Sequence, residues 1–442
     1  MRALSMLCLV MLAACAGAPD AGKAKKAEDP FYLKPTVFEK LPGWGSDAQS
    51  AALVPMQKSC ARILKKDAAK SFGPTDIAGS YADWQAVCEK LPADADDGTA
   101  RAYFADNFMP YEIWDAQDRD GLFTGYYEPI LHGSLKKKKP YVIPLYERPD
   151  DMVTVNLGDF KPELKGETVT GRVDGEKLVP YYTRADIEKG ALKKQDKVVW
   201  VNSAVDAFFL HIQGSGQVQM ENGDVLRVGY AAQNGRAYTA IGKSLLDKGE
   251  LQPGNVSMQS IRQWLETHPD QAADVMNINE SYVFFRKLDG DGPLGAEGVA
   301  LTPKRSMAID RKKFPYGAPI FIDAEAPDGM QQTVRTTVTK VQPGCAGYGM
   351  WYTKDEKVPT EKGARLQQLM VAQDTGGAIK GAVRGDFFWG AGDEAAHNAG
   401  VMKSKGQAYI LLPKSVTVPA KYAPRPWWMK AGGAAGGFVY ND

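Results

Sequence analysis

The 442-residue chain has little of what metalloproteins and nucleic-acid-binding proteins need. It contains only four histidines, and no pair of its five cysteines has the spacing of metal ligands, so we expect no metal site and no other cofactor. Its formal net charge is only +1 at pH 7, which gives no reason to expect binding to nucleic acid. No internal repeat is evident. We therefore expect the function to depend on the protein's own side chains rather than on a metal, a cofactor or nucleic acid.

Long apolar runs are also missing, except for the stretch from Ala3 to Ala14, which follows Arg2. This stretch is too short for a membrane-spanning helix and is typical of a targeting signal. Residues 12–15 read Leu-Ala-Ala-Cys, the lipobox pattern, so residues 1–14 are expected to be removed and Cys15 to be lipidated. Because Ala16 replaces the aspartate of an inner-membrane retention signal, we expect an outer-membrane lipoprotein that faces the Gram-negative periplasm. A plain secretory signal is the alternative.

The two ends of the mature chain differ from its middle. Residues 15–34 are mostly alanine, glycine, lysine and acidic residues without an apolar period, which predicts a flexible tether. Residues 426–442 include a glycine-rich stretch and are expected to form a disordered tail. Residues 35–115 have a helical apolar pattern, and Ser80 with Asp83 predicts a capping box.

Two cysteines fall on the apolar stripes of successive predicted helices. Cys60 shares its stripe with Leu53 and Met56, and Cys88 shares the next one with Trp84. Two packed helices could bring these thiols together, so we predict a Cys60–Cys88 disulfide, in keeping with an oxidising compartment.

The rest of the chain is expected to be mainly β. Residues 205–228 alternate between apolar and polar residues, and Asn222-Gly223 predicts a tight hairpin turn. Short helices are predicted to begin after Thr183 and Ser257. With 44% apolar residues, the chain can bury a large core in two or three domains.

The segment from Val371 to Gly400 carries the clearest chemical signal. Asp374 lies just before a Gly-Gly pair, and Asp386 leads directly into Phe387, Phe388 and Trp389. Aromatic neighbours remove water from a carboxyl, which raises its pKa, and a second carboxylate nearby raises it further. This arrangement suits a general acid, although aspartates in ordinary turns would give the same spacing.

Several segments resemble a known family. Asp310, Asp374 and Asp386 lie in AIDRKKFPYGAPIFI and AQDTGGAIKGAVRGDFFWG, which resemble the three-aspartate (3D) domain of bacterial cell-wall lytic enzymes. GLFTGYYEPIL, YYTRADIE, VDAFFLHIQGSGQV, GYAAQNGRAYTAIGKSL and NESYVFFR resemble the membrane-bound lytic murein transglycosylase A (MltA) family. The likeness extends from about residue 121 to about residue 412.

The resemblance implies a mainly β fold with N-terminal helices. A double-psi β-barrel domain is expected to contain residues 116–135 and 252–425, with the 3D domain at about 285–412. A second, smaller β domain, residues 136–251, is expected to be inserted, with a glycan groove between the two domains.

The resemblance also implies an activity and its residues. A lytic transglycosylase cleaves the β-1,4 bond between N-acetylmuramic acid and N-acetylglucosamine without water and leaves a 1,6-anhydromuramic end. One carboxyl acts first as acid and then as base. Asp386 matches this residue, Asp374 a supporting one, and Asp310 a structural or indirect one. The residues expected to contact the glycan are Thr124, Tyr126, Tyr127, Gln213, Ser215, Phe388 and Trp389.

Alternatives stay open at this stage. Tyr126 and Tyr127 fit barrel core as well as sugar stacking. A hydrolytic muramidase would need a second carboxylate, for which Asp374 or Glu394 would be candidates. A non-catalytic glycan-binding scaffold or a polysaccharide-loosening protein would keep the fold without the chemistry. Peptidoglycan, the outer membrane and cell-wall synthesis proteins are the expected partners.

Overall fold

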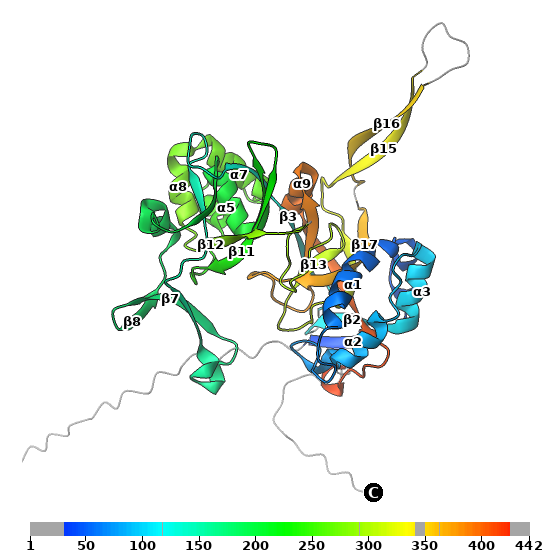
Figure 1. Ribbon diagram of the computed structural model, residues 1–442. Helices are drawn as coiled ribbons and strands as arrows, with labels where there is room; N and C mark the ends of the chain where they lie inside the picture. Colours follow the sequence, from blue (N-terminus) through cyan, green and yellow to red (C-terminus); the bar gives the residue numbers. More distant parts are fainter. Residues whose placement is uncertain (1–30, 117, 291, 341–349, 362, 425–442) are drawn as a thin grey trace, which may run out of the picture.

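The computed structural model describes residues 31–424 except 117, 291, 341–349 and 362 (Figure 1). The predicted signal peptide, Cys15, most of the predicted tether and the 426–442 tail therefore lie outside the described residues. The chain is mainly β, as predicted, and it builds two units, one around a barrel and one around an open sheet.

Six strands close into a barrel, because β19 pairs with β14 on one side and with β3 on the other. The β3–β18 and β13–β17 pairs are parallel, and the other pairs around the ring are antiparallel. The closed barrel agrees with the expectation, while its double-psi topology stays a prediction. In ring order the strands are β3 (Gly121–Glu128), β18 (Arg384–Ala391), β13 (Ser306–Ile309), β17 (Arg365–Asp374), β14 (Pro319–Glu325) and β19 (Lys403–Pro413).

Two strands at the N-terminal side were not predicted. β1 (Phe31–Pro35) pairs with β2 (Phe108–Asp115), and β2 pairs with β19 of the barrel. Phe31 and Leu33 alternate on the buried face of β1, so burial of apolar surface fixes this segment to the sheet. The tether prediction is therefore wrong for residues 31–34, and the helical prediction is wrong for 108–115.

The predicted helices do form between these strands. α1 (Ser50–Ile63), α2 (Tyr81–Cys88) and α3 (Asp97–Asn107) pack together beside β17 and β2. A disulfide joins Cys60 to Cys88, with 5.4 Å between their Cα atoms, and the capping box of Ser80 and Asp83 is present; both predictions are confirmed. Single 3₁₀ turns lie at Phe38–Lys40, Trp44–Ser46, Asp76–Ala78 and Ala420–Tyr422.

The second unit is built on an open six-stranded sheet whose apolar core includes Leu131, Val218 and Phe285. Its first and last strands in the sequence lie outside the expected limits of 136 and 251, because β4 pairs with β10 and β12 pairs with β11. In sheet order the strands are β12 (Val283–Leu288), β11 (Val225–Gln233), β10 (Ser215–Met220), β4 (Ile130–Ser134), β9 (Lys197–Val201) and β5 (Ile143–Tyr146).

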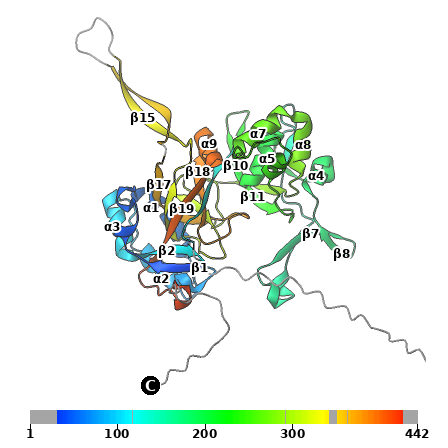
Figure 2. The same cartoon turned by 180° about the vertical axis from the view of Figure 1, so that it is seen from behind.

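Helices pack beside this sheet (Figure 2). They have an apolar core of their own that includes Phe208, Leu245 and Trp264. The strand prediction for residues 205–213 is wrong: they form α5, because Ser203 caps a segment whose apolar residues also fit a helical face. The caps at Thr183 and Ser257 and the Asn222-Gly223 turn are confirmed. The helices are α4 (Arg184–Asp186), the π-turn Ile187–Ala191, α5 (Ala204–Gln213), α6 (Ile241–Asp247), α7 (Met258–Thr267) and α8 (Pro269–Asn277).

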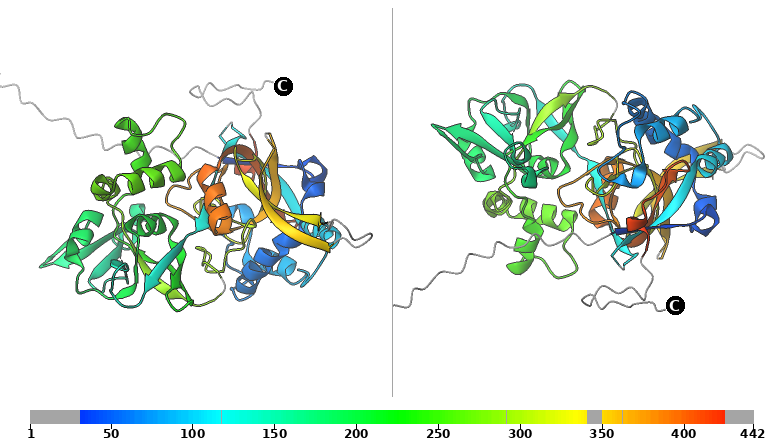
Figure 3. Two further views of the ribbon diagram at one scale, coloured as in Figure 1. Left: turned by 90° about the horizontal axis from the view of Figure 1, so that it is seen from above. Right: turned by 90° about the horizontal axis from the view of Figure 1, so that it is seen from below.

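Two smaller sheets extend from the units. The hairpin of β15 (Gln331–Lys340) and β16 (Met350–Pro359) projects from the barrel, and α9 (Asp393–Val401) covers β3 and β18 (Figures 1 and 3). None of the helices within the described ranges is long and apolar enough to cross a membrane. The remaining elements are β6 (Met152–Asn156), β7 (Thr168–Asp174), β8 (Lys177–Pro180) and the 3₁₀ turns Leu157–Asp159 and Pro162–Leu164.

Candidate active site

Strand pairing brings Asp374 and Asp386 to the same place on the barrel. Ala308 of β13 is the register partner of Asp374 on β17 and also of Asp386 on β18. A register shift between Met307 and Ala308 adjusts the β13–β17 pairing at this point. The two carboxyls therefore flank one short central strand and interact electrostatically.

Asp386 is held by a short chain of hydrogen bonds. The hydroxyl of Thr124, its register partner on β3, donates to Asp386 Oδ1 at 2.5 Å. Arg384 Nη2 donates in turn to Thr124 Oγ1 at 2.8 Å. Residues two apart in a strand point to the same face, which places the Arg384 guanidinium beside the Asp386 carboxyl. Asp386 therefore has one neutral hydrogen-bond donor, the Thr124 hydroxyl, and one nearby cation, the Arg384 guanidinium.

Asp374 has three hydrogen-bond donors. The backbone N–H groups of Ala296 and Thr375 donate to Asp374 Oδ1 at 2.9 and 2.8 Å. The hydroxyl of Tyr126, from the GYYEP segment of β3, donates to Oδ2 at 3.0 Å. Three donors stabilise a charged carboxylate more than a neutral acid, because each bond is stronger to the ionised oxygen.

Both carboxyls have raised pKa values. Burial raises the pKa of Asp386 from 3.8 to about 6, and the charge of Asp374 adds to the rise, against the lowering effects of Thr124 and Arg384. Burial likewise raises the pKa of Asp374 to about 6, against the lowering effects of its three donors. A carboxyl with a pKa near 6 can hold a proton and release it close to neutral pH, which general acid catalysis requires.

The aromatic residues near the pair are mostly buried. The Tyr126 ring lies 5.1 Å from the Phe388 ring and is half-buried, with its pKa raised well above 10 by burial and by the two aspartates. Phe388 and Trp389 are 2% and 5% exposed, and Tyr127 is 6% exposed, so none of these three rings offers an open face to a sugar. Only Phe388 shares a face of β18 with Asp386, which lies two residues before it, whereas Trp389 and Tyr127 belong to the apolar core. The prediction that these three rings contact the glycan does not fit this structure.

Gly125 shows how tightly this region is packed. A Cβ atom at Gly125 would lie 2.6 Å from Trp389 Nε1 and 2.9 Å from the Cα atom of Ala399 in α9. Only glycine allows β3 and α9 to approach this closely.

Gln213 and Ser215 lie where the second unit meets β3. Gln213 Oε1 accepts a hydrogen bond from the backbone N–H of Tyr127 at 3.1 Å. Ser215 begins β10 and pairs with Gly229. Glu128 is also buried at this junction, where Arg227 Nη1 and Gln217 Nε2 each donate to its carboxylate at 2.7 Å. These polar contacts fix the second unit to the barrel strand that carries Thr124.

Asp310 makes contacts that hold loops. Its carboxylate accepts hydrogen bonds from the backbone N–H groups of Lys312 and Gly381, each at 3.0 Å. Glu394, the other candidate for a second catalytic carboxylate, lies in the first turn of α9, and its carboxylate is 3.1 Å from Lys304 Nζ.

Sequence reasoning missed three participants in the site. Arg384 carried a usable signal, since it lies two residues before Asp386 and residues two apart in a strand point to the same face. The backbone donor of Thr375 is the residue next to Asp374, so it could have been expected. The donor of Ala296 carried no signal, because its loop meets β17 only through the tertiary fold. In the part of the chain that the structure describes, no cluster of three or more His, Cys, Asp or Glu residues could hold a metal ion.

Comparison with known proteins agrees with this architecture. Residues 122–286 match the model of the MltA specific insert domain, and residues 347–412 match the 3D domain. The curated membrane-bound lytic murein transglycosylase A of Escherichia coli K12 is 30% identical over 334 residues, covering 74% of this chain and 75% of the relative.

Solved structures give the same result. The membrane-bound lytic murein transglycosylase of Agrobacterium tumefaciens superposes with a TM-score of 0.72 at 30% identity, covering 87% of this chain and 98% of the other. Escherichia coli MltA with bound chitohexaose has a TM-score of 0.57 at 26% identity, covering 89% and 98%. Both units of the fold and the length of the match support one conclusion: the chain belongs to the membrane-bound lytic murein transglycosylase A family.

Proposed function

We propose that this protein is a peptidoglycan lytic transglycosylase in which Asp386 is the acid and then the base. The observation that carries the proposal is the pair of carboxyls flanking β13, whose pKa values are both about 6 and whose hydrogen-bond partners differ. Names and activities of the relatives support the reaction class, since they are lytic murein transglycosylases.

The reaction needs one proton donor that becomes a proton acceptor. Protonated Asp386 gives its proton to the glycosidic oxygen between muramic acid C1 and the N-acetylglucosamine, and the C1–O bond breaks. The Asp386 carboxylate then accepts the proton of the muramoyl C6 hydroxyl while that oxygen bonds to C1. The product is a 1,6-anhydromuramic end, and no water is consumed. This differs from hydrolysis, which uses a second carboxylate on water or on the sugar.

Asp374 suits a supporting role in this scheme. Positive charge develops at C1 while the glycosidic bond breaks, and a carboxylate already held by three donors stabilises it without having to rearrange. Its charge also disfavours ionisation of Asp386, which keeps the acid protonated at higher pH.

The glycan is proposed to cross the junction between the barrel and the second unit. Thr124 and Tyr126 lie at the aspartates on the barrel side, and Gln213 and Ser215 lie beside β3 on the other side. The structure of Escherichia coli MltA with chitohexaose supports binding of an extended amino-sugar chain by this fold.

We further propose that lipidated Cys15 anchors the protein to the outer membrane, facing the periplasm. The Leu-Ala-Ala-Cys pattern at residues 12–15 and the word "membrane-bound" in the names of the relatives support this location. Wall-synthesis proteins are the further partners expected there.

Product mass tests the reaction. Protein lacking residues 1–15 is incubated with peptidoglycan sacculi, and the soluble muropeptides are analysed by mass spectrometry. Muropeptides one water lighter than the hydrolysis products are expected from the unaltered protein and not from Asp386→Asn. Products with a reducing muramic acid would indicate a muramidase instead, and binding to sacculi without any release would indicate a scaffold.

A further inference from the structure

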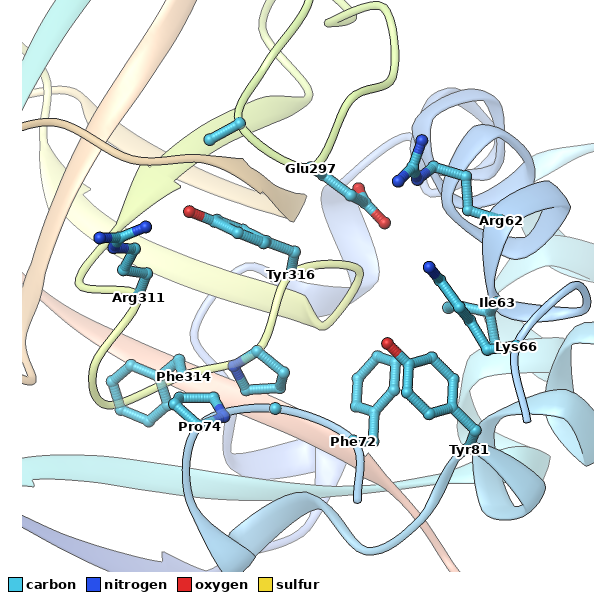
Figure 4. A pocket seen from close by; sticks show the side chains of 13 residues that line it. Arg62, Ile63, Lys66, Phe72, Pro74, Tyr81, Glu297, Arg311, Phe314 and Tyr316 are labelled. Atoms are coloured by element: carbon cyan, nitrogen blue, oxygen red, sulfur yellow. The ribbon is translucent and has the colours of Figure 1, made fainter. Parts of the chain in front are cut away.

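A cavity of about 380 Å³ lies between the N-terminal helices and the barrel, apart from the aspartate pair (Figure 4). α1 and the loop that follows it contribute Arg62 and Lys66, and the loop between β13 and β14 contributes Arg311 and Tyr316. Figure 4 shows Lys66 and Arg62 on one side of the cavity and Arg311 on the other. This volume is within the range of small-molecule sites.

The cavity is positively charged. Its lining includes three basic side chains and one acid, Glu297. Burial raises the pKa of Glu297 to about 7, against a hydrogen bond from Ser59 and the charge of Arg62, so near neutral pH this acid cancels only part of one positive charge. Across the described ranges, no acidic side chain forms an ion pair with Lys66 or Arg311. An anion is the complementary ligand.

The wall of the cavity is also the wall of the catalytic site. Ala296 lines the cavity, and its backbone N–H is the donor to Asp374 Oδ1. Tyr316 lines it as well and interacts electrostatically with Asp374. The Tyr316 hydroxyl is buried near Thr375 and makes no hydrogen bond of ordinary geometry, so this wall of the cavity is polar as well as charged.

We propose that this cavity binds the carboxylate-bearing peptide attached to the muramic acid next to the scissile bond. The inference rests on the proposed function. In peptidoglycan this peptide begins at the lactyl group on C3 of muramic acid, two carbons from the C1 atom at which Asp386 acts. Because the cavity shares a wall with the Asp374 site, the peptide on this muramic acid would lie next to the cavity.

The chemistry of the lining fits such a peptide. Arg311 and Lys66 are placed to bind carboxylates from opposite sides, and guanidinium is suited to two-point contact with a carboxylate. Exposed Pro74 and the half-buried ring of Tyr81 offer apolar surface to alanine methyl groups and aliphatic side chains, in front of the buried rings of Phe72 and Phe314.

The test compares two substrates and two pairs of variants. Turnover is measured on intact sacculi and on glycan strands from which an amidase has removed the peptides, which leaves the lactyl carboxylate free. The double variant that carries Lys66→Gln and Arg311→Gln is compared with a control double variant that carries Lys65→Gln and Lys312→Gln. The control residues are exposed neighbours outside the cavity. Binding of the free tripeptide L-Ala-γ-D-Glu-meso-diaminopimelate is measured by calorimetry in parallel.

We expect the Lys66 and Arg311 variant to lose roughly ten-fold or more in kcat/KM on sacculi, because charge-assisted hydrogen bonds are lost. On peptide-free strands it should change less than about two-fold, and the control pair should match the unaltered protein on both substrates. The variant should also lose tripeptide binding.

Three results would overturn the proposal: no loss on sacculi, an equal loss on both substrates, or unchanged tripeptide binding. An equal loss would assign the charges to the glycan or its lactyl carboxylate. Absence of turnover by the unaltered protein on both substrates would refute the proposed function separately, and calorimetry would then decide whether the cavity binds the peptide.

Discussion

The surroundings of Asp374 and Asp386 differ although their pKa values are alike. Asp374 accepts hydrogen bonds from two backbone N–H groups and from the Tyr126 hydroxyl. Asp386 accepts one hydrogen bond, from the Thr124 hydroxyl, which in turn is bonded by Arg384. Backbone N–H groups can only donate, so they favour the carboxylate form of Asp374. A hydroxyl can donate to a carboxylate and can also accept a hydrogen bond from a protonated carboxyl, so Thr124 suits both forms of Asp386. Similar pKa values can therefore accompany unequal roles: near pH 6 Asp386 is suited to exchange a proton, while the three donors of Asp374 favour its charged form.

Replacing Asp386 should have the largest effect. Asp386→Asn keeps the shape of the side chain but cannot give up a proton, and general acid–base catalysis is typically worth about 10² to 10⁴ in rate. Because the residue acts twice, we expect kcat on sacculi to fall by at least about 10³. Asp393→Asn, at an exposed aspartate on α9, is the control and should leave kcat unchanged. Loss of less than ten-fold would mean that another group is the acid.

Replacing Asp374 should cost less. Asp374→Asn keeps an oxygen for part of the donor set but removes the charge, and loss of one preorganised electrostatic contact typically costs about 10² to 10³ in kcat. We expect kcat to fall by about 10², the lower end of this range, while 1,6-anhydromuramic products still form. A complete loss equal to that of Asp386→Asn would remove the distinction between the two roles.

The raised pKa values also predict a stability cost. A carboxyl whose folded pKa exceeds its unfolded value stabilises the fold at pH below the unfolded pKa, and this contribution is lost as pH rises through the folded pKa. For Asp386 that window runs from 3.8 to about 6, and the loss amounts to up to about 3 kcal/mol above it. Asp386→Asn should therefore raise the free energy of unfolding relative to the unaltered protein at pH 8, and much less at pH 4. Urea titrations at both pH values measure this; an equal effect at both would contradict it.

Removing the Thr124 hydroxyl should have the smallest effect. Because this bond lowers the pKa of Asp386, Thr124→Val should raise that pKa further and move the alkaline fall of activity to higher pH. We expect kcat at pH 5 to change by less than about ten-fold, in line with the loss of one hydrogen bond. Thr124→Ser keeps the hydroxyl and should behave like the unaltered protein.

Local chemistry made part of this structure predictable. The Cys60–Cys88 disulfide followed from two apolar stripes, and the Ser80 cap and the Asn222-Gly223 turn followed from short-range hydrogen bonding and backbone preference. The two aspartates were identified from one contiguous segment and from the family resemblance.

Long-range pairing explains what the sequence did not predict. β1 is a strand because the edge of β2 pairs with it, in a ladder that runs from Phe31–Asp115 to Pro35–Tyr111. β2 begins 73 residues after β1 ends, so nothing local in the sequence required this strand. α5 was expected as a strand because its apolar residues fit both periods, and packing against α7 and β12 decided for the helix. The Ala296 donor to Asp374 likewise depends on a loop that only the tertiary fold positions.

The pH dependence of kcat/KM for the unaltered protein and for Asp374→Asn tests the division of roles most directly. The account predicts that activity of the unaltered protein falls as pH rises above about 6, when Asp386 loses its proton. In Asp374→Asn the like charge is gone, so the pKa of Asp386 drops and the fall should begin at lower pH. A fall that stays at the same pH, or moves to higher pH, would contradict the claim that Asp374 holds the proton on Asp386.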